Sequence, residues 1–253
     1  MDRDRDTARL AQQMQQQLTV GYREEELITT NDATRIPQMQ NINKSVCMVK
    51  TPGGGHGTGF LADIPGQGVA FLSAGHNFSV VDVSGVKTLH ANLDFRQIIL
   101  HFGNQDGDLR GTNALRTCSL WELGSVMGSI GYGGKRRFFP GNIPATSLPH
   151  EDYCFLLLRG QDIKTTLKAL DLAYLEVGHG NFLKYVPHGQ VIIWGHPAND
   201  DIKKEEGGKY PLRQSIGMEM VNNDADSTEL LKYDADTLGG NSGSPLIGRT
   251  DVP

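Results

Sequence analysis

Glycines surround a single serine, Ser242, in the segment DTLGGNSGSPLI that occupies residues 236–247. A serine hydroxyl is a weak nucleophile, so a serine held in such a turn indicates a nearby base and backbone N–H groups that face an oxyanion. Gly240 has no Cβ, and the chain can therefore turn its amides inward at that position. We expect Ser242 to act as a nucleophile and the amides of Gly240 and Ser242 to form an oxyanion hole.

Three other interpretations compete for this segment. Gly, Asn and Ser dominate ordinary turns for conformational reasons, and the segment alone leaves that alternative open. A phosphate-binding loop would need Gly-Lys-Ser or Gly-Lys-Thr before a helix, whereas Pro245 follows here. An α/β-hydrolase elbow would need glycine at the position of Ser244 and a histidine after the serine. The sequence has neither, so the hydrolase interpretation fails, and Pro245 argues against the phosphate-binding loop.

One histidine stands where two predicted strands end. Residues 58–62 and 69–74 have the composition of paired strands, and Gly75 and His76 follow them directly. With an ordinary pKa of about 6.5, a histidine can accept a serine proton and return it to a leaving amine near neutral pH. We therefore expect His76 to be the general base and acid.

A nucleotide or a metal would leave other signals. The glycines around Thr58 begin a dinucleotide-type pattern, but residues 63–66 predict a turn where the phosphates would need a helix. None of the eight histidines falls in a zinc-binding pattern. We expect no metal and no other cofactor.

A carboxylate heads the apolar run of residues 153–158. Asp152 would enter buried surroundings there, which is costly without a partner. The imidazole of His76 is the natural partner, because Asp152 would orient it and stabilise its charged form. Glu151 and Asp94 are the rivals for this role, and the strand register favours Asp152.

The remaining segments give the order of the chain. Residues 1–40 are polar and predict a surface arm or linker, with a short helix at Leu10, Met14 and Leu18 and an interruption at Pro37. A partner-binding role for this arm stays open. Residues 161–175 have near-helical apolar spacing, which suits a connection between two units, and residues 191–195 predict a strand of the second unit.

Composition excludes several partners. The net charge of −5 gives no basic surface for nucleic acid, and no run of about 18 apolar residues predicts a membrane span. The three cysteines, Cys47, Cys118 and Cys154, cannot all pair, and the polar start lacks the apolar run of a secretory signal. We expect free thiols in a reducing compartment such as the cytoplasm, with Cys47 and Cys154 as small core residues on strands.

Three stretches together resemble a known family. GTGFL with LSAGH at residues 57–61 and 72–76, EDYCFLLL at 151–158 and GGNSGSP at 239–245 are similar to the chymotrypsin-like serine proteases. The V8-like glutamyl endopeptidases are nearest in motif. The resemblance covers roughly residues 41–253.

This resemblance implies an all-β fold of two six-stranded antiparallel barrels, the first in about residues 41–160 and the second in about 175–253. It implies a His76, Asp152 and Ser242 triad that hydrolyses peptide bonds of a protein or peptide substrate through an acyl-enzyme, without a cofactor.

The sequence departs from the family pattern in two places. Asn241 replaces the aspartate that receives a new N-terminal ammonium in digestive proteases, so activation of that kind is not expected. Eleven residues follow Ser242, where the family has two more strands. The second barrel is therefore expected to be incomplete, and a catalytically impaired binding or scaffold module is the alternative to an enzyme.

Asp236 and Thr237 are the candidate residues of the substrate pocket. In the V8-like enzymes a threonine at the position of Thr237 contacts a glutamate side chain, and a hydroxyl donor suits a carboxylate. If Asp236 faces the pocket instead, it would pair with Lys or Arg. Both specificities stay open.

Overall fold

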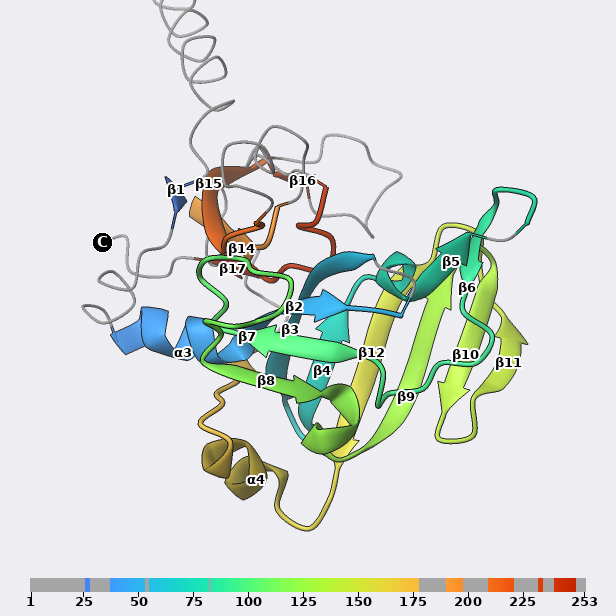
Figure 1. The fold of residues 1–253 in the computed structure, drawn as a ribbon, viewed down its shortest axis with the longest axis horizontal. Coiled ribbons are helices and arrows are strands. Elements are labelled where there is room, and N and C mark those ends of the chain that lie inside the picture. The colour runs from blue at the N-terminus through green and yellow to red at the C-terminus, as the bar shows by residue number, and fades with distance from the viewer. Residues whose placement is uncertain are drawn as a thin grey trace, which may run out of the picture.

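The computed structural model describes residues 26–27, 37–52, 55–81, 83–177, 190–197, 209–220, 232–233 and 239–248. Within these residues the protein consists mainly of antiparallel strands with few helices, which confirms the all-β class (Figure 1). The strands form a ten-stranded sheet, a five-stranded sheet and a two-stranded sheet. In the described part of the chain each large sheet is an open path of strands, whose end strands do not pair with each other.

The ten-stranded sheet has the order β11-β10-β9-β12-β4-β3-β2-β7-β8, and β13 pairs with β3 in parallel. Its strands are β2 (Val46–Lys50), β3 (His56–Ile64), β4 (Gly68–Ser73), β7 (Ile99–Phe102), β8 (Arg116–Ser119), β9 (Ser125–Tyr132), β10 (Lys135–Phe139), β11 (Ile143–Thr146), β12 (Asp152–Arg159) and β13 (Leu175–Glu176). The two-stranded sheet pairs β5 (Ser79–Val81) with β6 (Lys87–Leu89).

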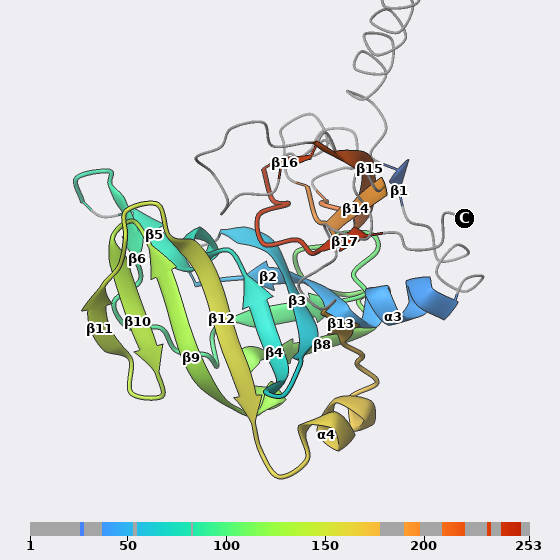
Figure 2. The same cartoon turned by 180° about the vertical axis from the view of Figure 1, so that it is seen from behind.

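The five-stranded sheet has the order β1-β15-β14-β17, and β16 pairs with β15. Its strands are β1 (Glu26–Leu27), β14 (Gln190–Gly195), β15 (Arg213–Met220), β16 (Lys232–Tyr233) and β17 (Leu246–Gly248). Seen from behind, this sheet lies beside β2 and β3 (Figure 2). One strand of the polar arm, β1, thus pairs with a strand that is far from it in the sequence.

The strands of the ten-stranded sheet contribute most of the main core. Leu61, Phe71, Leu100, Ile130 and Leu156 are fully buried there, each from a different strand. Apolar residues alternate along these strands with residues of the opposite face, so each strand contributes one row of side chains to the core.

A second apolar cluster joins the two large sheets. Val46 of β2 packs with Trp194 of β14 and with Leu212, and Phe60 packs against them. The first four residues of β2 are all buried, because the main core covers one face of this strand and the second cluster covers the other. The burial of these apolar side chains holds the sheets together.

The helices differ partly from expectation. Helix α3 (Pro37–Ser45) begins at the proline that was expected to interrupt the chain. Proline suits the first helical position, because its fixed φ is already helical and no intrahelical N–H bond is needed there. Helix α4 (Ile163–Ala169), capped by the Asp162 side chain, confirms the predicted helix in residues 161–175. The predicted helix at residues 10–18 lies outside the described residues.

All three cysteines are free and buried. Cys47 lies on β2 and Cys154 on β12, both in the core, which confirms their interpretation as small core residues. Burial raises the pKa of both thiols well above its ordinary value, so these thiols stay protonated. No helix in the described segments has the length and apolarity to cross a membrane.

Candidate active site

The turn that carries His76 lies against the strands β9 and β12. This 3₁₀ turn, η2 (Gly75–Phe78), follows directly after β4 and Ala74. A Cβ at position 75 would lie 2.0 Å from the Gly131 carbonyl oxygen, so only glycine allows this close approach. The turn therefore places His76 at the start of β12.

His76 and Asp152 form a two-point contact. The His76 backbone N–H donates to Asp152 Oδ1 at 2.8 Å, and His76 Nδ1 lies 2.6 Å from Asp152 Oδ2. Desolvation alone would raise the pKa of Asp152, but the hydrogen bonds from the His76 ring and backbone outweigh it and lower that pKa below its ordinary value. An anionic carboxylate only accepts, so Nδ1 carries the proton and Nε2 is left as the basic nitrogen.

The Asp152 carboxylate is more exposed than the sequence analysis expected. Its side chain is 39 % exposed, and that of His76 is 32 % exposed. Asp152 is the first residue of β12, so it lies at the end of the sheet, and the buried part of the strand begins only after it. Both solvent and His76 therefore stabilise the negative charge of Asp152.

The two rival carboxylates have other partners. Arg136 Nη2 lies 2.6 Å from each carboxylate oxygen of Glu151. Asp94 Oδ1 accepts the backbone N–H of Arg96. The structure therefore brings Asp152 to His76, and it holds the two rivals elsewhere.

The Ser242 carbonyl is fixed next to the histidine turn. It accepts hydrogen bonds from Asn77 Nδ2 at 2.9 Å and from the Thr58 backbone N–H at 3.0 Å. Asn77 is the residue after His76. In the described part of the chain the Ser242 hydroxyl makes no hydrogen bond with His76. Catalytic hydrogen bonds of this kind are often long without substrate and tighten only when substrate binds.

The glycines beside Ser242 have positive φ angles, 92° at Gly240 and 87° at Gly243. A Cβ at Gly243 would lie 2.3 Å from the Thr58 carbonyl oxygen, so a side chain does not fit there. The Gly240 carbonyl accepts the Thr58 hydroxyl at 2.9 Å. Thus the residues expected to form the oxyanion hole belong to a turn that is held from β3.

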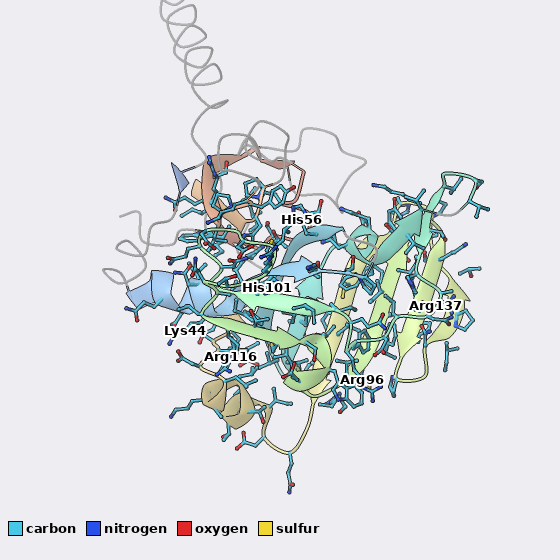
Figure 3. All side chains as sticks on the ribbon, in the orientation of Figure 1. Lys44, His56, Arg96, His101, Arg116 and Arg137 are labelled. Atoms are coloured by element: carbon cyan, nitrogen blue, oxygen red, sulfur yellow. The ribbon has the colours of Figure 1, made fainter. Side chains whose placement is uncertain are left out.

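A buried histidine, His196, which directly follows β14, supports this arrangement. Its ring Nδ1 lies 2.9 Å from the Tyr210 carbonyl oxygen, and its backbone N–H donates to the Thr58 hydroxyl. Burial, together with the charges of His56 and His101, which Figure 3 labels, lowers the pKa of His196 to about 4, and the hydrogen bond to the Tyr210 backbone opposes this fall only in part. His196 is therefore neutral near pH 7.

Sequence reasoning missed the roles of Thr58, Asn77 and His196. The close glycines around Thr58 were the available signal, since they indicate backbone packed tightly on both sides. The pocket candidates Asp236 and Thr237 lie outside the described residues. Where the structure describes the chain, no group of three His, Cys, Asp or Glu residues could hold a metal ion.

No protein-family model matches the chain, and no curated protein matches it significantly. Solved structures are similar to it. A Glu endopeptidase in complex with MPD is 18% identical, with a TM-score of 0.49 over 82% of this chain and 74% of the other. Deg5 is 16% identical, with a TM-score of 0.41 over 88% and 83% of the two chains.

The protease Anisep from Arthrobacter nicotinovorans is 12% identical, with a TM-score of 0.48 over 81% of this chain and 78% of the other. An endopeptidase and a protease thus stand among the similar structures, as the sequence motifs led us to expect. At TM-scores this low, the similarity carries no argument about the site.

Proposed function

We propose that the chain is a serine endopeptidase that uses Ser242 as nucleophile, His76 as general base and acid, and Asp152 as the residue that orients His76. One observation carries this proposal: the Asp152 carboxylate binds both the backbone and the ring of His76, and the next residue, Asn77, binds the carbonyl of Ser242. A base with a fixed tautomer and a serine in a glycine-rich turn are thereby held in one place.

The reaction begins when Ser242 Oγ attacks the carbonyl carbon of a peptide bond and His76 Nε2 takes the hydroxyl proton. The amides of Gly240 and Ser242 stabilise the oxyanion. His76 then gives its proton to the leaving nitrogen, the C–N bond breaks, and an acyl-enzyme forms. Water attacks this ester with His76 again as base, and the acid product and free Ser242 result.

The electrostatics suit this sequence of proton transfers. Asp152 is anionic at neutral pH and receives Nδ1–H, so it stabilises the imidazolium that forms when His76 takes the serine proton. The reaction uses protein groups and water only.

The substrate is a protein or peptide, and its specificity rests on the two pocket candidates. Thr237 in the pocket would favour an acidic side chain before the cut bond, and Asp236 in the pocket would favour Lys or Arg.

Labelling with a fluorophosphonate, which reacts with activated serines, tests the proposal. We expect one adduct per chain, on Ser242, and no adduct in Ser242→Ala. Ser125→Ala, which removes an exposed serine of β9, is the matched control and should label like the wild-type chain. An unlabelled wild-type chain would contradict the enzyme and favour a non-catalytic binding module.

A further inference from the structure

Thr58 lies where the two sheets and the nucleophile turn meet. It sits on β3, is 0 % exposed, and its hydroxyl makes two hydrogen bonds of 2.9 Å. Thr58 Oγ1 accepts the His196 backbone N–H and donates to the Gly240 carbonyl. Only a hydroxyl can accept and donate in this way from one atom, so an apolar residue of the same shape would lose both bonds.

The backbone of Thr58 binds the same region. Its N–H donates to the Ser242 carbonyl at 3.0 Å, and its carbonyl oxygen accepts the Ser73 hydroxyl at 2.7 Å. Ser73 is the last residue of β4, the strand that leads to His76. One buried residue therefore contacts the nucleophile turn at Gly240 and at Ser242, and it also binds the strand before the histidine.

The surroundings leave Thr58 little room to move. A Cβ at Gly195 would lie 3.1 Å from Thr58 Oγ1, and a Cβ at Gly243 would lie 2.3 Å from the Thr58 carbonyl oxygen. Backbone thus packs against both its side chain and its main chain. The position of Thr58 is fixed by the sheet, and the turn is fixed by Thr58.

Gly240 needs such a restraint. A glycine at a φ of 92° has many other conformations available, and it has no side chain that could hold it in this one. We propose that Thr58 is a positioning residue, whose hydroxyl fixes the Gly240 carbonyl and so keeps the Gly240–Ser242 turn in its reactive conformation. This inference rests on the proposed function, because the turn is the one that carries the nucleophile.

The test measures how fast a fluorophosphonate labels Ser242. We expect Thr58→Val to lower the labelling rate constant about 100-fold, the size of effect that a small misplacement of reacting groups produces. All chains of this variant should still be labelled when the reaction has finished. Loss of folded protein alone would lower that fraction and leave the rate constant of the remaining chains unchanged.

Two further variants sharpen this result. Thr58→Ser should keep the rate within about threefold of the wild-type value, because its hydroxyl can make the same two bonds. Thr51→Val removes another buried hydroxyl of the same hairpin, whose one hydrogen bond among the described residues is to the Gly55 carbonyl, and should leave the rate unchanged. If Thr58→Val does not fold, Thr58→Cys is used in its place. Its labelling rate is then compared with that of Thr58→Ser, because the two variants differ only in a sulfur atom in place of an oxygen atom.

The outcomes separate this inference from the proposed function. A wild-type chain that does not react with the probe overturns the proposed function and this inference together. A reactive wild-type chain with equal rates in Thr58→Val, or equal rates in Thr58→Cys and Thr58→Ser, overturns the role of Thr58 and leaves the enzyme standing. Slow labelling in Thr58→Val with rescue by serine supports both.

Discussion

The two halves of the candidate site are held by different kinds of interaction. His76 and Asp152 hold each other, through a charged side chain and a ring, at the ends of strands of one sheet. The Gly240–Ser242 turn is held through its carbonyl groups by neutral donors, the Thr58 hydroxyl, the Thr58 N–H and the Asn77 amide. Three of the six residues 239–244 are glycines, which have no side chain to restrain them, so Thr58 and Asn77 supply a restraint from outside the turn.

The two halves should therefore respond differently to mutation. A change in the charged half removes a group that takes part in proton transfer, whereas a change in the neutral half displaces groups that remain present. The first should cost reaction rate by many orders of magnitude, and the second should cost much less. The predictions below test this difference.

The largest effect is expected when the charged half or the nucleophile is removed. Ser242→Ala, His76→Ala and the double variant should each lower hydrolysis of fluorescently labelled casein by about 10⁶-fold, because the residues act as one unit. The losses should not add. If the double variant loses the product of the single losses, the two residues act independently and the triad is wrong.

A smaller loss is expected for Asp152→Asn, about 10⁴-fold in kcat. The asparagine oxygen can still accept the His76 backbone N–H, but its amide would donate to Nδ1 and force the proton onto Nε2. Asp94→Asn, at the rival carboxylate, is the control and should keep full activity. Equal losses in the two variants would mean that no single carboxylate orients His76.

His196, whose backbone N–H binds the Thr58 hydroxyl behind the neutral half, should make the stability of the protein depend on pH. His196 has a pKa of about 4 in the folded protein and an ordinary pKa of about 6.5 when unfolded. Between these values the unfolded chain binds more protons, so the free energy of unfolding should fall as pH falls from about 6.5 to 4, by roughly 3 kcal/mol. Urea unfolding at several pH values measures this fall.

The variant His196→Asn provides the comparison for that pH series. Its amide can replace the donor to the Tyr210 carbonyl and does not titrate, so the fall over this pH range should become shallower by the contribution of His196. A wild-type slope that is the same as that of His196→Asn would show that this residue does not titrate with folding.

The smallest effect is expected for Asn77→Ala. It removes one donor to the Ser242 carbonyl, but the Thr58 N–H still binds the same oxygen. The variant also loses the Asn77 bonds to the Ser73 hydroxyl and the Thr58 carbonyl, but only the bond to Ser242 reaches the nucleophile turn, so the fluorophosphonate labelling rate should fall by about tenfold. A loss as large as that of Asp152→Asn would erase the difference between the two halves.

Local sequence patterns suggested the charged half of the site. The strand register favoured Asp152 over Glu151 as the partner of His76, and the structure places Asp152 Oδ2 at 2.6 Å from His76 Nδ1. The near-helical apolar spacing of residues 161–175 predicted helix α4. The exposure of Asp152 was not predictable, because it depends on where β12 begins relative to its neighbours. The start of α3 was missed because Pro37 was weighed as a helix breaker and not as a first helical residue.

The hydrogen bonds that hold the neutral half could not be predicted from local patterns, although the glycine-rich pattern itself indicated the turn. The hydroxyl of Thr58 binds partners 138 and 182 residues away in the sequence, and no short motif records such distances. The local sequence of a buried threonine between two glycines is the same whether its hydroxyl binds nothing or binds two backbone groups. Only the packed structure, with Gly195 and Gly243 against Thr58, distinguishes these cases.

The hydrogen bonds of Thr58 also set an order in time. His76 and Asp152 are 76 residues apart, whereas Thr58 and Gly240 are 182 residues apart, so the second contact closes a much longer loop. A chain is made from its N-terminus and folds in that order. A growing chain can therefore form its His76–Asp152 pair before Ser242 has been synthesised. The ability to hydrolyse a substrate would arise only after the five-stranded sheet has been synthesised and has packed against the ten-stranded sheet.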